Sequence, residues 1–213
     1  MFKALIFDMD GVLIDSEPLH KKIEQDILKE LGVNLPLEEH FKYASMGNEF
    51  WDIMEKRYGY NRKTTADELH KDKATRYLKV LTSNPIIPIT GLVELVNHAQ
   101  KKGLVLAVAS SSSVFNINLV LNAIGLKKHF SLIVSGEQVT RNKPFPDIYL
   151  KTALLLNLTP SECMVVEDSA NGVNAAKAAG MFCIGYRNLN SGNQDISNAD
   201  VIVDTLSEAD KLI

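Results

Sequence analysis

The sequence predicts an α/β fold, a doubly wound Rossmann-like parallel sheet with an inserted helical cap domain. An apolar run, Leu5–Phe7, leads without polar alternation into Asp8, as expected for a strand buried on both faces of a parallel sheet. No credible strand lies between Asp15 and Leu104, where the pattern is helical. From Gly91 onward, helical segments alternate with short apolar runs, which is the rhythm of βα units.

The first motif, Asp8-Met-Asp10-Gly11, directly follows the first strand. Ligands of open α/β sheets bind at the carboxyl ends of the strands, so we expect Asp8 and Asp10 at the floor of a ligand crevice. Gly11 permits the sharp turn behind them. Because Asp-x-Asp pairs also arise by chance, a solvated turn with an Asx cap is the alternative interpretation. The buried strand before the motif and the apolar residues after it favour the crevice.

The composition indicates one globular domain, or one domain with an insertion: 213 residues, 46% hydrophobic and a net charge of -3. This mild acidity lacks the basic face that nucleic acids and anionic membranes require, so neither is an expected partner. No run reaches the roughly 18 apolar residues of a membrane span, and Asp8 comes too early for a secretory signal. Cys163 and Cys183 lie in apolar runs, which indicates buried free thiols and fits a reducing compartment. We expect a cytoplasmic monomer.

A helical cap domain is expected over residues 16–83, inserted into a core domain formed by residues 1–15 and 84–213. Ser16 is a candidate N-cap for the first helix, whose apolar residues recur every four positions until Gly32 can end it in a left-handed conformation. Further helical segments are expected at Glu38–Ala44, at Glu49–Tyr58 and after the capping box Thr65–Glu68.

The rest of the chain supplies the sheet and its covering helices. Helices are expected at Leu92–Lys101, Val114–Ile124, Pro146–Leu156 and Ala170–Ala179. Strands are expected at Leu104–Ala109, Leu132–Val134, Met164–Val166, Phe182–Gly185 and Val201–Val203. Together with the first strand this makes five or six parallel strands with crossover helices.

Polar side chains follow four of the predicted strands. Besides the Asp-x-Asp motif these are the Ser110–Ser113 run, Lys143 in the loop after the third strand, and Glu167 with Asp168. Each has an ordinary alternative: the serines could cap a helix, Lys143 could be a solvated loop charge, and the two acids could be a capping pair. Because all four groups fall at the same edge of the sheet, we expect them to form one site.

Phosphoryl transfer is the chemistry that these groups suit. Carboxylates gathered at one edge raise each other's pKa unless a hard cation neutralises them, and oxygen ligands favour Mg²⁺. Lys143 and the Ser110 hydroxyl can contact the oxygens of a transferring phosphoryl group, on which negative charge is spread. No Cys/His cluster indicates zinc, and no Gly-x-x-x-x-Gly-Lys loop indicates nucleoside triphosphates.

In their order along the chain, four motifs resemble the haloacid dehalogenase superfamily: Asp8-Met-Asp10-Gly-Val, Ser110, Lys143-Pro, and Glu167-Asp168. The early helical insertion and the segment Asp-Ser-Glu-Pro-Leu-His20 are similar to the branch that holds β-phosphoglucomutases and sugar-phosphate phosphatases. The resemblance covers the whole chain.

The resemblance implies a role for each core residue. Asp8 would be the nucleophile that forms an aspartyl-phosphate, and Asp10 would be the general acid and base. Mg²⁺ would be held by the carboxylates of Asp8 and Asp168 and the backbone carbonyl of Asp10, with Glu167 as a direct or water-mediated ligand. The phosphoryl oxygens would be bound by Ser110 and Lys143, and Lys143 would also restrain Asp8.

Further substrate contacts implied by the resemblance come from the cap and from the serine run: Ser16, His20, Gly47, Lys73, Ser111 and Ser112. Such a cap closes over the site and contacts the leaving group. His20 could instead be an ordinary surface histidine. Phe50 and Trp51 are expected to pack within the cap rather than to bind a sugar.

The sequence favours a phosphatase acting on a small phosphorylated metabolite, expected to be a sugar phosphate, over two alternatives. A β-phosphoglucomutase-type enzyme would have Arg where this chain has Phe50, and Lys-Asn where it has Ser113-Val114, although Lys73 stands where a mutase would have a lysine. A catalytically inactive phospho-ligand-binding protein would have no need of the nucleophile Asp8.

Overall fold

The computed structural model describes residues 1–43, 49–59 and 64–213. They form two compact units. The sheet unit comprises Met1–Asp15, Ile86–Leu189 and Gln194–Ile213, and the helical unit comprises Ser16–Pro85 with Asn190–Asn193. The domain boundaries derived from the sequence, 1–15 with 84–213 and 16–83, stay a prediction. No sequence pattern indicated that Asn190–Asn193 group with the helices.

A six-stranded parallel sheet forms the centre of the sheet unit, in the order β3-β2-β1-β4-β5-β6. The chain builds β2 and β3 on one side of β1 and then returns to build β4, β5 and β6 on the other side. The strand order therefore reverses beside β1, where open parallel sheets bind their ligands. The predicted fold class is confirmed. The strands are β1 (Ala4–Phe7), β2 (Val105–Ser110), β3 (Leu132–Ser135), β4 (Cys163–Glu167), β5 (Phe182–Tyr186) and β6 (Val201–Val203).

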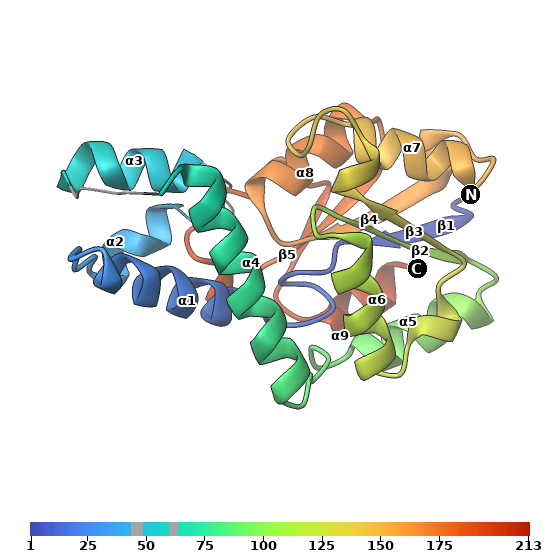
Figure 1. Cartoon of the computed structure of the whole chain (residues 1–213). Coiled ribbons are helices and arrows are strands. Elements are labelled where there is room, and N and C mark those ends of the chain that lie inside the picture. Colours follow the sequence, from blue (N-terminus) through green and yellow to red (C-terminus); the bar gives the residue numbers. More distant parts are fainter. Residues whose placement is uncertain (44–48, 60–63) are drawn as a thin grey trace. The chain divides into compact units, whose positions relative to one another are not determined.

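Helices cover both faces of this sheet. α7 (Asp147–Leu155) and α8 (Ala170–Ala178) share a core with the β1 residues Ala4 and Ile6, while α5 (Leu92–Lys101) and α6 (Val114–Ala123) cover the opposite face (Figure 1). The short α9 (Leu206–Ala209) packs against α5. The ends of the four longer helices, α5, α6, α7 and α8, lie within one residue of the predicted ends. The apolar periodicity was sufficient to predict the bounds of these helices, because each helix buries one face on the sheet.

In the helical unit, α1 (Glu17–Glu30) packs against α4 (Ala66–Ser83). Between them lie α2 (Leu37–His40), a 3₁₀ turn at Phe41–Tyr43, and α3 (Glu49–Tyr58). The predicted capping box is confirmed, because Glu68 N donates to Thr65 Oγ1 at 3.2 Å and Thr65 N donates to Glu68 Oε2 at 2.7 Å.

The predicted N-cap at Ser16 is wrong. Ser16 precedes α1, but its side chain makes no capping hydrogen bond to the helix. Its backbone is helical, with φ -90° and ψ -16°, whereas a capping residue is normally extended so that its side-chain oxygen reaches the first free amides. The predicted left-handed end of this helix is confirmed by Gly32, whose φ is +80°.

Both cysteines, Cys163 and Cys183, are free and buried, as predicted. Among the described helices, none has the length and apolarity needed to cross a membrane. The cytoplasmic location and the monomeric state stay predictions.

Candidate active site

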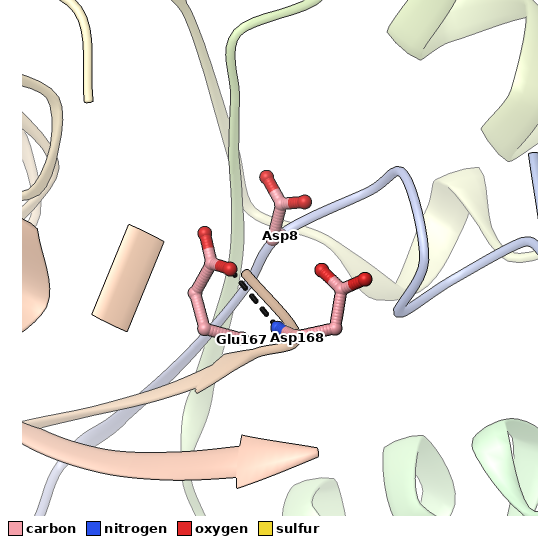
Figure 2. Close-up of side chains that lie close together, drawn as sticks. All are labelled: Asp8, Glu167 and Asp168. Atoms are coloured by element: carbon pink, nitrogen blue, oxygen red, sulfur yellow. Dashed lines mark hydrogen bonds between the residues drawn. The ribbon is translucent and has the colours of Figure 1, made fainter. Parts of the chain in front are cut away.

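Three acidic side chains gather at the carboxyl ends of β1 and β4 (Figure 2). Asp8 follows β1, Glu167 ends β4, and Asp168 comes next. The two strands are parallel neighbours in register, so their ends lie side by side. One oxygen of each carboxylate lies within 4.8 Å of the other two, and all three residues are buried. We call these three residues the acidic cluster.

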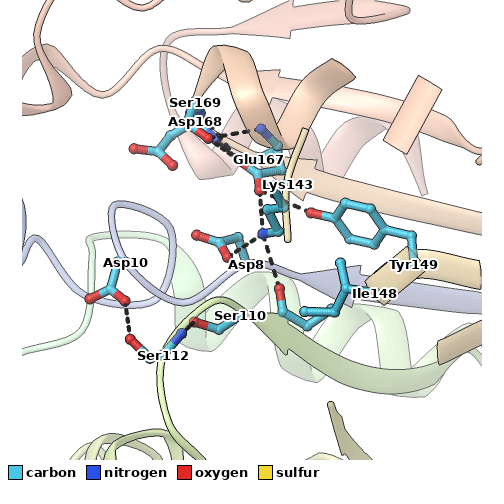
Figure 3. Close-up of polar contacts among 12 residues, drawn as sticks. Asp8, Asp10, Ser110, Ser112, Lys143, Ile148, Tyr149, Glu167, Asp168 and Ser169 are labelled. Atoms are coloured by element: carbon cyan, nitrogen blue, oxygen red, sulfur yellow. Dashed lines mark hydrogen bonds and ion pairs between the residues drawn. The ribbon is translucent and has the colours of Figure 1, made fainter. Parts of the chain in front are cut away.

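The Lys143 ammonium lies against the acidic cluster (Figure 3). Its Nζ donates to Asp8 Oδ1 at 2.6 Å, to Glu167 Oε1 at 2.6 Å and to the Ala109 carbonyl at 3.1 Å. An ammonium carries three N–H groups, so these three acceptors use all of them. The structure thus brings Lys143 into direct contact with Asp8, from which it is separated by 135 positions in the sequence.

The segment that carries Lys143 is braced by a neighbouring ion pair. The Arg141 guanidinium donates to both oxygens of Asp147, at 2.7 and 3.2 Å, and lies 4.6 Å from the centre of the Phe145 ring. Asp147 is the first residue of α7. The pair therefore ties the loop around Lys143 to the start of a helix that packs on the sheet.

Glu167 is fully buried, and both of its oxygens accept hydrogen bonds from the protein. Oε1 accepts from Lys143 and from the Tyr149 hydroxyl at 2.9 Å. Oε2 accepts from the backbone amides of Asp168 and Ser169, at 3.0 and 3.1 Å, and from the Ser169 hydroxyl at 3.1 Å. Sequence reasoning did not single out Tyr149 or Ser169, because each fits an ordinary helical pattern as a core residue or an N-cap.

The electrostatics of the acidic cluster follow from its burial. Burial raises the pKa of Asp8 to about 7; the charge of Lys143 opposes this rise, while Glu167 and Asp10 add to it. Burial alone would lower the pKa of Lys143, but the two carboxylates that it contacts raise it, so this side chain stays protonated. The protein alone therefore leaves Asp8 only partly ionised near neutral pH.

Two glycines allow the backbone to approach the acidic cluster. A Cβ added at Gly11 would lie 1.9 Å from Asp168 Oδ2, and a Cβ added at Gly172 would lie 1.7 Å from Glu167 Oε1. Gly11 also has a φ of +84°, which other residues rarely adopt. Its place in the Asp-x-Asp-Gly motif is thus required both by the turn and by the close approach of Asp168.

Asp10 is directed toward the serine run (Figure 3). Its Oδ2 accepts a hydrogen bond from Ser112 Oγ at 2.8 Å, and Ser112 N donates to Ser110 Oγ at 3.1 Å. From β3, Ser135 Oγ donates to the Ser112 carbonyl at 2.7 Å. Ser110 is buried and Ser111 is exposed. Ser112, expected to contact substrate, therefore contacts Asp10, and the supporting Ser135 was not predicted.

The remaining predicted substrate contacts belong to the helical unit. Ser16 is buried, and the His20 ring stacks on Tyr77 with 4.2 Å between ring centres. Gly47 lies outside the described residues.

Lys73 of the helical unit forms an ion pair with Glu24, and both side chains are largely buried. The other oxygen of Glu24 lies 2.6 Å from His40 Nε2. Burial would raise the pKa of Glu24, but the charge of Lys73 and the hydrogen bonds from His40 and Lys73 lower it. The charge of Lys73 is thus compensated inside the helical unit.

The acidic cluster suits a hard divalent cation. It offers carboxylate oxygens, which are the ligands that such cations prefer, at separations that one ion can bridge. Lys143 contacts two of these three buried carboxylates, Asp8 and Glu167, and even with this contact the pKa of Asp8 is raised, because burial opposes its ionisation. A cation bound to the cluster would offset that cost.

The comparisons with known proteins agree with this geometry. The family model of the haloacid dehalogenase-like hydrolases matches residues 5–186. YhcW of Bacillus subtilis is 34% identical over 98% of this chain and 94% of its own length. Hexitol phosphatase B of Escherichia coli K12 is 33% identical over 85% of this chain and 82% of its own length.

A solved structure is similar along almost the whole chain. CbbY from Rhodobacter sphaeroides, in complex with phosphate, superimposes with a TM-score of 0.85 at 28% identity, covering 98% of this chain and 96% of that protein. Another structure of CbbY contains xylulose-(1,5)bisphosphate. With its sheet order, its helical insertion after β1 and its acidic cluster, the chain belongs to the haloacid dehalogenase-like hydrolases.

Proposed function

We propose that this protein is a Mg²⁺-dependent phosphatase that hydrolyses a small phosphomonoester, a sugar phosphate, through a phosphorylated Asp8. The observation that carries the proposal is the contact of Lys143 Nζ with Asp8 Oδ1 at 2.6 Å, beside two further buried acids. A carboxylate held in this way by an ammonium is an oriented nucleophile. The same positive charge favours a phosphoryl group next to it.

Asp8 and Asp10 would carry out the two chemical steps. An oxygen of Asp8 attacks phosphorus, the bond from phosphorus to the leaving oxygen breaks, and Asp10 gives that oxygen a proton. Water then attacks the phosphorus of the aspartyl-phosphate, Asp10 takes a proton from the water, and inorganic phosphate leaves with Asp8 regenerated. Ser112 Oγ donates to Asp10 Oδ2, which orients the carboxyl group of Asp10 for these proton transfers.

The metal would be held by the carboxylates of Asp8 and Asp168 and by the backbone carbonyl of Asp10. Of the two possibilities for Glu167, contact through water fits better, because both of its oxygens already accept hydrogen bonds. When bound, Mg²⁺ supplies the positive charge that keeps Asp8 ionised and neutralises the oxygens of the phosphoryl group.

Lys143 and Ser110 would complete the phosphoryl site. Lys143 holds Asp8 and provides positive charge next to the reacting oxygens. The Ser110 hydroxyl accepts a hydrogen bond from Ser112 N, so it retains its own hydrogen for donation to a phosphoryl oxygen. Ser111, exposed at the same strand end, would add a further contact.

A sugar phosphate is supported by two relatives. The name of hexitol phosphatase B indicates a phosphorylated sugar alcohol as its class of substrate. Structures of CbbY have been solved with a sugar bisphosphate and with phosphate. In this chain, the cap residues Ser16, His20, Gly47 and Lys73 would contact the leaving group.

A phosphatase is favoured over a mutase by the pairing of Lys73. A mutase must hold a bisphosphate in two orientations, which requires a second cationic site in the cap. The ammonium of Lys73 is paired with Glu24, so its charge is already compensated. A second phosphate at Lys73 would have to displace Glu24, which would leave a buried carboxylate without its partner.

The test is a panel of phosphorylated metabolites assayed for phosphate release with and without Mg²⁺. We expect release from at least one sugar phosphate, dependent on Mg²⁺ and reduced on the order of 10³-fold or more in Asp8→Asn and in Asp10→Asn. Undiminished turnover in folded Asp8→Asn would refute the nucleophile. Conversion of β-glucose 1-phosphate to glucose 6-phosphate without phosphate release would refute the phosphatase function and support the mutase function.

A further inference from the structure

The carboxylate of Glu167 acts as a fixed support for Lys143. It is fully buried, and its Oε2 is held by two backbone amides and one hydroxyl from Asp168 and Ser169. A carboxylate has about four lone-pair positions, so little capacity for a further ligand remains once Oε1 has also accepted its donors. The position of Oε1 then decides where the ammonium of Lys143 lies.

Tyr149 contacts both members of this pair (Figure 3). Its hydroxyl donates to Glu167 Oε1 at 2.9 Å, and Lys143 Nζ lies 5.1 Å from the centre of its ring. Tyr149 is fully buried on α7, and burial raises the pKa of its hydroxyl well above the ordinary range. The hydroxyl therefore remains protonated and serves as a hydrogen-bond donor.

Removal of the Tyr149 hydroxyl would take away one of the two donors to Glu167 Oε1. Oε2 would remain held by its three donors, so the carboxylate as a whole would stay in place. Oε1 would keep only the hydrogen bond from Lys143 and would attract that ammonium more strongly. Lys143 divides its donors among Asp8, Glu167 and the Ala109 carbonyl, so a stronger attraction to Oε1 draws the ammonium away from Asp8. Reaction geometry is sensitive to displacements of this kind.

We infer that Tyr149 is a positioning residue of the active site, whose hydroxyl acts through Glu167 to place the Lys143 ammonium on Asp8. As a role in catalysis, this inference rests on the phosphatase function proposed above. The contacts of Tyr149 with Glu167 and Lys143 are tested separately, in the absence of substrate and metal.

Tyr149→Phe removes the hydroxyl and keeps the ring. The matched control is Thr152→Val on the same helix; Thr152 is also fully buried, and its hydroxyl donates only to the Ile148 carbonyl of its own helix, at 2.8 Å. We expect kcat to fall about tenfold in Tyr149→Phe with KM little changed, since one hydrogen bond to a charged group is lost from a positioning chain. Thr152→Val should retain the kcat of the unmodified protein.

The readout that does not depend on activity is the NMR signal of the buried Lys143 ammonium in metal-free protein, assigned with Lys143→Arg. Tyr149→Phe should shift or broaden this signal, and Thr152→Val should leave it in place. If Tyr149→Phe is insoluble, 3-fluorotyrosine at position 149 makes the hydroxyl a stronger donor and should shift the signal in folded protein.

Three results would overturn the inference: an unchanged Lys143 signal after the change at Tyr149, an unchanged kcat in Tyr149→Phe, or equal losses in Tyr149→Phe and Thr152→Val. If no phosphate release is found in the unmodified protein, the proposed function fails. The NMR comparison still decides whether Tyr149 positions Lys143.

Discussion

Replacement of Asp8 by Asn should make the metal-free protein more stable at neutral and alkaline pH. Burial raises the pKa of Asp8 from 3.8 to about 7, so ionisation of this side chain is opposed in the folded state. Because the folded pKa lies above the unfolded one, the stability linked to this group is fully present below pH 3.8 and is lost as the pH rises to 7 and beyond. Asn has nearly the same shape and cannot ionise.

The magnitude follows from the shift. About three pKa units at ~1.4 kcal/mol each give a total loss of ~4 kcal/mol in the unmodified protein. Between pH 5 and pH 8 the loss is about 2 to 3 kcal/mol, because part of it has already occurred below pH 5. Asp8→Asn should not show this loss.

The assay is urea unfolding with EDTA present, at half-unit intervals from pH 5 to pH 8. The control is Asp204→Asn, which removes an exposed carboxylate paired with Arg187. Surface ion pairs contribute little to stability, so its curve should remain parallel to that of the unmodified protein. Mg²⁺ at 100 times its dissociation constant should then stabilise the unmodified protein by about 2.7 kcal/mol and Asp8→Asn by much less. Parallel curves for Asp8→Asn and the unmodified protein, or equal stabilisation of both by Mg²⁺, would refute the account of Asp8 as a metal-dependent buried acid.

Two further perturbations test the supporting contacts. Ser112→Ala should lower kcat, measured as steady-state phosphate release, about tenfold because it removes the hydrogen bond from Ser112 to Asp10, and Ser112→Thr should restore most of it. An effect confined to KM would instead indicate direct substrate contact. Glu24→Gln should destabilise the helical unit by roughly 3 to 5 kcal/mol at pH 7, because Lys73 stays buried without its partner. Because the pKa of Glu24 is lowered in the folded state, the difference in unfolding free energy between Glu24→Gln and the unmodified protein should shrink as the pH falls below 4.5. Unfolding can be followed by the fluorescence of Trp51, the single tryptophan. A difference that stayed constant with pH would contradict this reasoning.

The helix and strand bounds predicted from the sequence were most accurate where an element buries one face against the rest of the protein. The helix at Leu92–Lys101 and the strand at Val201–Val203 were predicted to the residue, because their apolar pattern matches their packing on the sheet. The capping box at Thr65 was also predictable, since both of its partners lie within four positions. Ser16 was predicted wrongly, because a capping hydrogen bond depends on a backbone conformation that residue type alone does not fix.

In the candidate site, too, some features could be predicted from the sequence and others could not. The acids at the ends of β1 and β4 could be placed at one edge, because the carboxyl ends of parallel strands meet at the same edge of a sheet. The contact between Lys143 and Asp8 could be expected only from a family resemblance. Tyr149 had no signal of its own, because a buried tyrosine on a helix is an ordinary core residue until its hydroxyl is seen to reach Glu167.

The sequence by itself determined the elements, the sheet and the edge at which its polar groups collect, because periodicity and turn residues are local properties. Only the tertiary structure decided which donor meets which oxygen: Ser112 with Asp10, Tyr149 with Glu167, and Glu24 with Lys73. Those pairings join residues far apart in the chain, and they depend on side-chain directions and burial, which exist only once the elements have packed together.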